Sequence, residues 1–269
     1  MAVTNFIQTI WSHDILKKLE LETKLVDGCL RSYEGDAKYA HTVKILGVGE
    51  PTITDYTGDD LNYEEMSDEG QELNIDQRKA FHFLVNDVDM AQSVPGLREE
   101  YQRKAVHGLA IARDSYVANL IKGVTGNVTT ADTLTREGIK NAIDAAIVAL
   151  RERNFNEDGR IEITPAVYNL FKNELITLST DNPEYIKKGI VGMYDGFKVI
   201  MSNNMAKDSN YAYCDVRGEK AIAFVAQLDE VEAMRHPSRF SDIVRGLDVF
   251  GAKVIDADRI QVIKVPLNA

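Results

Sequence analysis

The residues that could perform catalysis are scattered along the 269-residue chain. Ser12, His13 and Asp14 have the residue types of a hydrolytic triad, but consecutive helical residues point about 100° apart and do not hydrogen-bond in series. The histidines stand apart from one another, at positions 13, 41, 82, 107 and 236. The sequence contains no phosphate-binding P-loop, no G-x-S-x-G and no H-E-x-x-H motif. We therefore assign no catalytic residue and predict that the protein is not an enzyme.

One segment, residues 154–165, partly matches a calcium-binding loop. Asn154, Asn156 and Asp158 stand where such a loop places its first three ligands. The last position, which should supply a bidentate glutamate, is Pro165. A polar turn before a strand is the better interpretation, and we predict neither a metal nor a cofactor, although cation binding at this turn stays open.

The elements that must position any site include two unusually long strands, residues 221–235 and 239–255. At about 3.3 Å per residue the second could reach on the order of 50 Å, which is the diameter of a compact protein of this size. Gly246 and Gly251 lie within it. Their missing side chains would allow another backbone to approach, either from a neighbouring subunit or at a bend within one subunit.

Helical periodicity marks several further segments. Leu97–Ile121 forms the clearest helix, between Pro95-Gly96 and Gly123, and its predicted apolar stripe is Leu97, Tyr101, Ala105, Leu109, Ala112, Tyr116 and Leu120. A second helix, 135–154, has the stripe Ile139, Ile143, Ala146, Ile147 and Leu150. Residues 159–173 should form a short strand and then a helix that begins at Pro165. Residues 192–203 should form a turn followed by a strand.

Residues 5–25 have mostly helical spacing and are either an amphipathic helix or an arm that docks on a neighbour. Residues 42–49, 51–57 and 71–89 should form three strands. No lysine or arginine lies between Lys44 and Arg78, whereas ten acidic residues do. This region is either a solvated acidic hairpin or a charged projection that seeks a basic partner surface.

Composition excludes several classes of protein. With 44% hydrophobic and 27% charged residues, the chain can bury a core. The net charge of −11 argues against a protein that grips nucleic acid through its phosphates. The distant Cys29 and Cys214, together with an N-terminus unlike a signal peptide, predict synthesis in a reducing cytoplasm. No apolar run is long enough to span a membrane.

The order of these segments resembles the major capsid proteins of tailed bacteriophages, which have the α+β fold of the Hong Kong 97 type. The resemblance rests on the stretches "MAVTNFIQTIWS", "YEGDAKYAHTVKILGVGEPTITDYT", "ELNIDQRKAFHFLVNDVDMAQ", "GRIEITPAVYNLF" and "VEAMRHPSRFSDIVRGLDVFGAKVI". It implies an N-terminal arm (1–35) and an extended β-hairpin loop (36–80). It also implies a peripheral domain with a long spine helix and long strands (81–128 and 219–254), and an axial domain (129–218 and 255–269).

By this resemblance, the protein would self-assemble as pentamers and hexamers into an icosahedral shell that encloses phage double-stranded DNA without sequence-specific binding. The predicted partners are the chain itself and, as open possibilities, a separate scaffolding protein, a portal and decoration proteins; no membrane is involved. The virion would be its location, after synthesis in the bacterial host cytoplasm. The alternatives are an encapsulin-like cargo shell of the same fold and, less favoured, an α/β enzyme with an unrecognised site.

The candidate contacts between subunits fall into four groups. They are the arm residues Phe6, Ile7 and Trp11; the loop acids Asp55, Asp59, Asp60, Glu64 and Glu65; the basic residues Arg98, Arg103, Lys104 and Arg113; and the glycines Gly246 and Gly251.

Two departures from the family pattern matter. Some relatives carry an N-terminal scaffolding extension, whereas the arm here begins at Met1, which predicts a separate scaffold or none. Some also form isopeptide cross-links from a loop lysine, but residues 45–77 contain no lysine. Lys38 and Lys44 lie at the base of the loop, so we expect a shell held together without covalent links.

Overall fold

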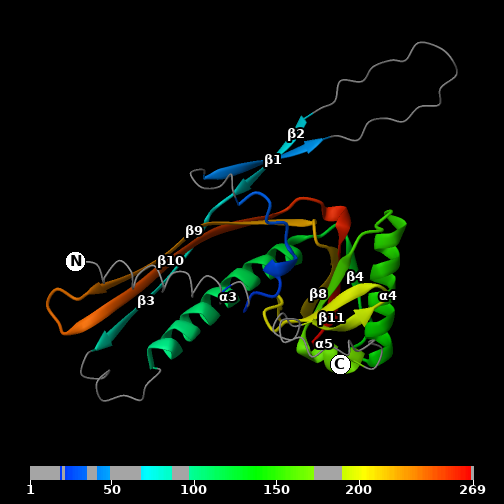
Figure 1. Ribbon diagram of the computed structural model, residues 1–269. Helices are drawn as coiled ribbons and strands as arrows, with labels where there is room; N and C mark the ends of the chain where they lie inside the picture. The colour runs from blue at the N-terminus through cyan, green and yellow to red at the C-terminus, as the bar shows by residue number, and fades with distance from the viewer. Residues whose placement is uncertain are drawn as a thin grey trace, which may run out of the picture.

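The computed structural model describes residues 19, 22–34, 41–48, 68–86, 97–172 and 190–267. In these residues the protein is an elongated plate of strands with one long helix alongside, joined at one end to a compact unit of sheet and helices (Figure 1). The predicted strand 51–57, the loop acids and the arm residues Phe6, Ile7 and Trp11 lie outside the described residues, as does Ser12-His13-Asp14.

The plate is a three-stranded antiparallel sheet in the order β3-β10-β9. Its strands are β3 (Gln77–Asn86), β9 (Ile222–Arg235) and β10 (Ser241–Val254). The two long strands are 14 residues each, so the sequence prediction of overlong strands is confirmed. A shift of register between Val249 and Phe250 marks a bulge in their pairing.

The long helix α3 (Leu97–Gly123) packs beside β10, as the sequence predicts. Its predicted apolar stripe is wrong in phase by about one residue: Tyr101 is exposed, and Tyr116 and Leu120 are only half-buried. The buried positions are Val106, Leu109, Ala110, Arg113, Asp114, Val117, Ala118 and Ile121. The helix is covered on two sides, by β10 and by Leu19 with residues 22–28, and these covers bury the charged Arg113 and Asp114, which an apolar pattern does not reveal.

A six-stranded mixed sheet in the order β4-β11-β8-β5-β7-β6 forms the compact unit. Its strands are β4 (Val128–Thr130), β5 (Gly159–Ile163), β6 (Ile190–Tyr194), β7 (Phe197–Met201), β8 (Tyr211–Gly218) and β11 (Ile260–Pro266). A short 3₁₀ turn, η4 (Ala257–Arg259), precedes β11. The segment 192–203 is thus a strand pair and not a turn followed by one strand; Asp195 and Gly196 make its turn with positive φ.

Helices α4 (Arg136–Glu152) and α5 (Pro165–Phe171) cover this sheet. Every predicted stripe residue of α4 is buried, from Ile139 to Leu150. Thr135 and Thr164 cap the two helices by accepting hydrogen bonds from Gly138 and Val167, and Pro165 occupies the first turn as predicted. The turn 154–158 leads into β5, as the polar-turn interpretation predicts.

The described part of the segment 71–89, residues 71–86, belongs to two strands and not to the single strand that its pattern predicts. Within it, β2 (Asp68–Asn74) pairs antiparallel with β1 (Thr42–Val48), whereas β3 pairs with β10. The chain changes sheets at Ile75, whose side chain is buried with Val43, Ile45 and Leu73 against Val249. This small core seats the β1–β2 hairpin on the plate (Figure 1).

Candidate assembly surfaces

One face of the three-stranded sheet packs on α3, and the opposite face carries exposed side chains. Directly paired residues of neighbouring strands share a face. Leu84, Ile243 and Met234 therefore form a row across β3, β10 and β9. The next row is His82, Arg245 and Glu232. We call this surface the outer face; it comprises Ala80, His82, Leu84, Glu232, Met234, Ile243, Arg245 and Leu247.

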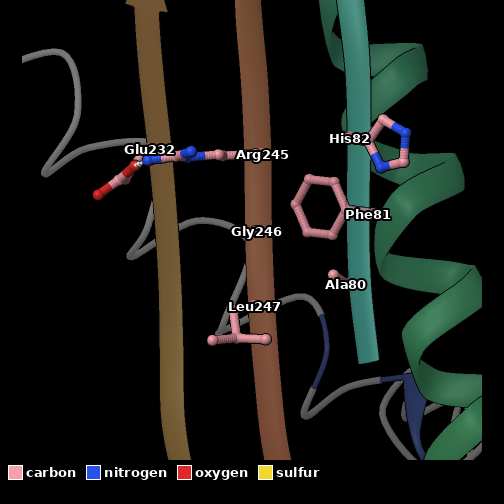
Figure 2. Close-up of a pocket in the computed structure, with 7 residues that line it drawn as sticks. All are labelled: Ala80, Phe81, His82, Glu232, Arg245, Gly246 and Leu247. Atoms are coloured by element: carbon pink, nitrogen blue, oxygen red, sulfur yellow. Dashed lines mark hydrogen bonds and ion pairs between the residues drawn. The ribbon is translucent and has the colours of Figure 1, made fainter. Parts of the chain in front are cut away.

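The apolar residues of the outer face are unusually accessible for a sheet. Leu84 is 52% exposed and Met234 is 40% exposed. A hollow of about 430 Å³ adjoins this face. Figure 2 shows two of its sides: Arg245 extends toward Glu232 of β9, and the ring of Phe81 lies beside Gly246. The Arg245 Nε donates to Glu232 Oε2 over 2.7 Å at the surface. An apolar row beside a charged row is the composition of a protein contact surface.

The turn between β9 and β10 ends the plate with an exposed aromatic ring. Phe240 is 81% exposed, and with Leu84 and Arg239 it lines a shallow hollow at this tip. Sequence reasoning missed both this tip and the apolar row. The sequence did contain a signal that could have identified Phe240, because a large aromatic residue is unusual in a polar turn such as residues 236–241.

Gly246 and Gly251 make close contacts inside the subunit. A Cβ at Gly246 would lie 2.3 Å from the ring of Phe81, and one at Gly251 would lie 2.3 Å from the carbonyl oxygen of Asn74. Of the two alternatives, these contacts favour an approach within one subunit, and a role of the glycines between subunits stays a prediction. Because Gly251 has no side chain, the backbone at Asn74 and Ile75 can approach β10 closely, and this contact holds the β1–β2 hairpin on the plate.

Arg113 is also inside the subunit, and we withdraw it as an interface residue. Its Nε and its Nη2 donate to the Asp248 carboxylate over 2.8 and 2.6 Å, and both side chains are buried. The guanidinium lies 5.7 Å from the ring centroid of Phe224 and 5.8 Å from that of Phe250. This ion pair ties α3 to β10. No sequence pattern indicates this pair, because the two residues are far apart in the chain.

The other basic candidates lie at the N-terminal end of α3. Arg103 and Lys104 are exposed, and Arg103 forms an ion pair with Glu100 over 2.7 Å. The side chain of Arg98 lies outside the described residues. Arg103 and Lys104 remain candidates for an acidic partner.

A buried cluster of charges, which sequence reasoning also missed, lies in the six-stranded sheet. Arg217 of β8 is fully buried, donates to Glu162 of β5 over 2.8 Å, and lies 3.4 Å from an oxygen of Asp215. Arg160 lies 3.6 Å from Glu162. Burial, and then the neighbouring Glu162 carboxylate, raise the pKa of Asp215 well above its usual range. The cluster is sealed from solvent, so it serves the fold and not a substrate.

The described residues contain no arrangement typical of catalysis. The thiols of Cys29 and Cys214 are buried, and burial raises their pKa values to about 11 and about 12, so neither is a reactive thiolate at neutral pH. No three histidine, cysteine or carboxylate side chains converge as metal ligands in this part of the chain. No helix in the same residues has the length and apolarity needed to cross a bilayer.

Asp114 of α3 gives the described residues a specific pH dependence. Burial raises its pKa to about 6, against four hydrogen bonds that lower it. Between about pH 4 and pH 6, the folded protein therefore holds a proton that the unfolded chain has lost. We expect the free energy of unfolding to fall by about 3 kcal/mol as the pH rises through this range.

The variant Asp114→Asn isolates this contribution. The pKa of Asp215 is also raised, but it is raised in the wild type and in the variant alike, so it does not contribute to the difference between them. Denaturant unfolding of the unassembled subunit at pH 4.5 and pH 7, for wild type and variant, measures the difference. Equal pH slopes in the two proteins would contradict the assignment.

Comparison with solved structures decides the fold. A structure titled "Mycobacterium phage Che8" matches with 27% identity over 90% of this chain and 90% of the other, at a TM-score of 0.71. The capsid of the cyanophage P-SCSP1u matches at 16% identity over 93% and 88%, with a TM-score of 0.66. The chain has the Hong Kong 97-type fold of phage capsid proteins.

This capsid fold is also found outside phages. An encapsulin from Synechococcus elongatus matches at 13% identity over 84% of this chain and 83% of its own, with a TM-score of 0.60. Neither a family model nor a curated protein sequence matches the chain. The structural matches confirm the Hong Kong 97-type fold that the resemblance of the sequence predicts, including its overlong strands.

Proposed function

We propose that the chain is a major capsid protein, a structural subunit that self-assembles as pentamers and hexamers into an icosahedral phage head around double-stranded DNA. The observation that carries this proposal is the match to a phage structure over 90% of both chains at 27% identity. The flat plate supports it, because a shell subunit has to be thin and wide. The net charge of −11 suits a wall that encloses DNA without binding it.

The four-part division stated above is part of the proposal: an arm (1–35), an extended loop (36–80), a peripheral domain (81–128 and 219–254) and an axial domain (129–218 and 255–269). The contacts between subunits would use Phe6, Ile7 and Trp11 of the arm and the loop acids. Arg103 and Lys104 with Arg98 would receive an acidic loop, and the outer face and Phe240 would pack against neighbours. Apolar burial at roughly 25 cal/mol per Å², repeated over many contacts, would supply the cohesion.

The proposed partners are further copies of the chain, a portal and, where the phage encodes them, scaffolding and decoration proteins. The location would be the virion, after synthesis in the cytoplasm of the host. No enzymatic activity is part of the proposal.

Electron microscopy of the purified protein tests the function. We expect closed particles hundreds of ångströms across, built from pentamers and hexamers. A protein that stays monomeric or dimeric at micromolar concentration, with and without co-expressed scaffold and portal genes, would contradict a shell function.

A cargo shell of the encapsulin type is the second candidate, favoured by the structural match to an encapsulin. The content of the particles separates the two. Particles from infected cells that hold nuclease-protected double-stranded DNA support the capsid, whereas particles that hold a protein cargo and no DNA support the cargo shell.

We predict that mature particles contain no covalent links between subunits. An isopeptide link would need a loop lysine, but Ile45–Gln77 contains none, and Lys44 lies on β1 at the loop's base. Particles boiled in detergent should run as one band at the monomer mass of 30.1 kDa. A ladder of larger species that survives reducing agent would contradict this prediction and implicate Lys38 or Lys44, which Lys→Arg variants would then distinguish.

A further inference from the structure

The segment Thr23–Leu30, which we call the root segment, joins the N-terminal residues to the body of the subunit. It contains a 3₁₀ turn, η1 (Val26–Gly28), and its side chains Leu25, Val26 and Cys29 are buried in the core shared by α3 and the sheets. Buried backbone groups need hydrogen-bond partners. A turn of three residues satisfies few of them itself, and Leu25 at its N-terminus has no capping side chain.

The N–H groups of the root segment are bound from one side by α3. The fully buried Asp114 carboxylate accepts hydrogen bonds from the backbone N–H groups of Lys24 at 3.1 Å, Leu25 at 3.0 Å and Val26 at 3.3 Å. The side-chain amide of Asn204 donates a further bond to it at 3.3 Å. Asp114 thus acts as a cap supplied by a distant part of the chain.

The carbonyl groups are bound from the other side by β8. The buried Arg217 guanidinium donates to the carbonyl oxygens of Leu25 at 2.8 Å and Gly28 at 2.7 Å. Glu162 holds the same guanidinium over 2.8 Å. A side chain at position 28 would displace the Arg160 guanidinium, because a Cβ there would lie 2.0 Å from one of its nitrogens.

The root segment is also attached at its C-terminal end, and the chain before it is attached at Leu19. Leu30 exchanges backbone hydrogen bonds with β9, to Ile222 at 2.8 Å and from Phe224 at 3.0 Å. Leu19 is buried against α3 beside Val106, Leu109 and Ala110. The chain therefore runs from the middle of α3, between the two charged side chains, to the long strand β9.

We propose that Asp114 and Arg217 are positioning residues that clamp the root segment between α3 and the six-stranded sheet, and so fix the place at which the preceding residues join the subunit. Charge-assisted hydrogen bonds are about twice as strong as neutral ones, which suits two side chains that hold five backbone groups. The clamp stands on the geometry alone. Its consequence for assembly, that every copy presents its arm at the same place, rests on the proposed function.

Hydrogen exchange of the unassembled full-length subunit tests the clamp. In Asp114→Ala, we expect the amides of Lys24, Leu25 and Val26 to exchange at least about tenfold faster, while the amides of β8 and β11 keep their wild-type protection. Asp114→Asn retains one carbonyl oxygen and should give an intermediate rate. Arg217→Lys keeps the positive charge beside Glu162 and Asp215, so the variant should fold. It loses the guanidinium bonds to the root segment, so the Leu30 amide should exchange faster.

Asp248→Ala is the matched control, because it removes a buried carboxylate beside α3 that does not touch the root segment. It should raise exchange in α3 and β10 without a selective rise at Lys24–Val26. Root amides that keep wild-type rates in Asp114→Ala, or a rise equal to that of β8 and β11, would overturn the clamp.

Assembly of the same variants tests the consequence. A stable subunit with a freed root segment should give fewer closed particles than wild type. Normal yields from such a variant would overturn the positioning role. Failure of the wild type to form particles would instead count against the proposed function, and the exchange result would still decide the clamp.

Discussion

Replacement of residues 52–65 by a short Gly-Ser linker is expected to leave a folded subunit that no longer closes shells. The deletion removes the five loop acids and stops before β2, so the buried Leu73 and Ile75 stay in place. If each of the five acids contributes about 0.5 kcal/mol at an exposed pair, the loss is about 2.5 kcal/mol per contact, more than tenfold in affinity. Repetition over the many contacts of a shell makes the effect on assembly larger still.

Circular dichroism and thermal unfolding should match the wild type, and electron microscopy with sedimentation should show subunits or capsomers in place of shells. Neutralising Asp132, Glu137 and Glu152, exposed acids of the compact unit, is the matched control and should leave assembly nearly unchanged. If the deletion variant closes normal shells, the loop is not an interface.

Asp248→Ala is expected to cost about 3–5 kcal/mol of folding free energy, because it leaves Arg113 buried without its carboxylate. That is a large part of the 5–15 kcal/mol that is typical of a folded protein. Denaturant unfolding of the unassembled subunit measures the loss. The double variant Arg113→Met/Asp248→Leu should recover most of it, since an apolar pair of similar volume needs no charge compensation.

The surface pair on the same sheet supplies the control. Arg245 and Glu232 are also hydrogen-bonded, but both side chains are about half exposed, so Glu232→Ala should cost less than about 1 kcal/mol. Equal losses for Asp248→Ala and Glu232→Ala would show that burial does not set the strength of the Arg113–Asp248 pair.

The sequence alone determined the elements whose side chains follow one period over many residues. The stripe of α4, the start of α5 at Pro165 and the two long strands all appear where the pattern predicts them. The reason is that local periodicity reports one continuous apolar face, and that Pro and Thr mark helix starts through local backbone chemistry. The resemblance to the capsid fold depended on the same elements in the same order.

Only the tertiary structure decided which side chains meet across the chain. The predicted stripe of α3 was wrong in phase because residues 22–28 cover a second side of the helix and bring Asp114 into the core. The sequence analysis placed Arg113 at the surface, whereas the structure buries it in an ion pair with Asp248, which is far away in the sequence. Gly246 and Gly251 likewise serve Phe81 and Asn74 of the same subunit. A buried charge is stable only when a partner compensates it. No local sequence pattern identifies a partner that is distant in the chain and is brought close by folding.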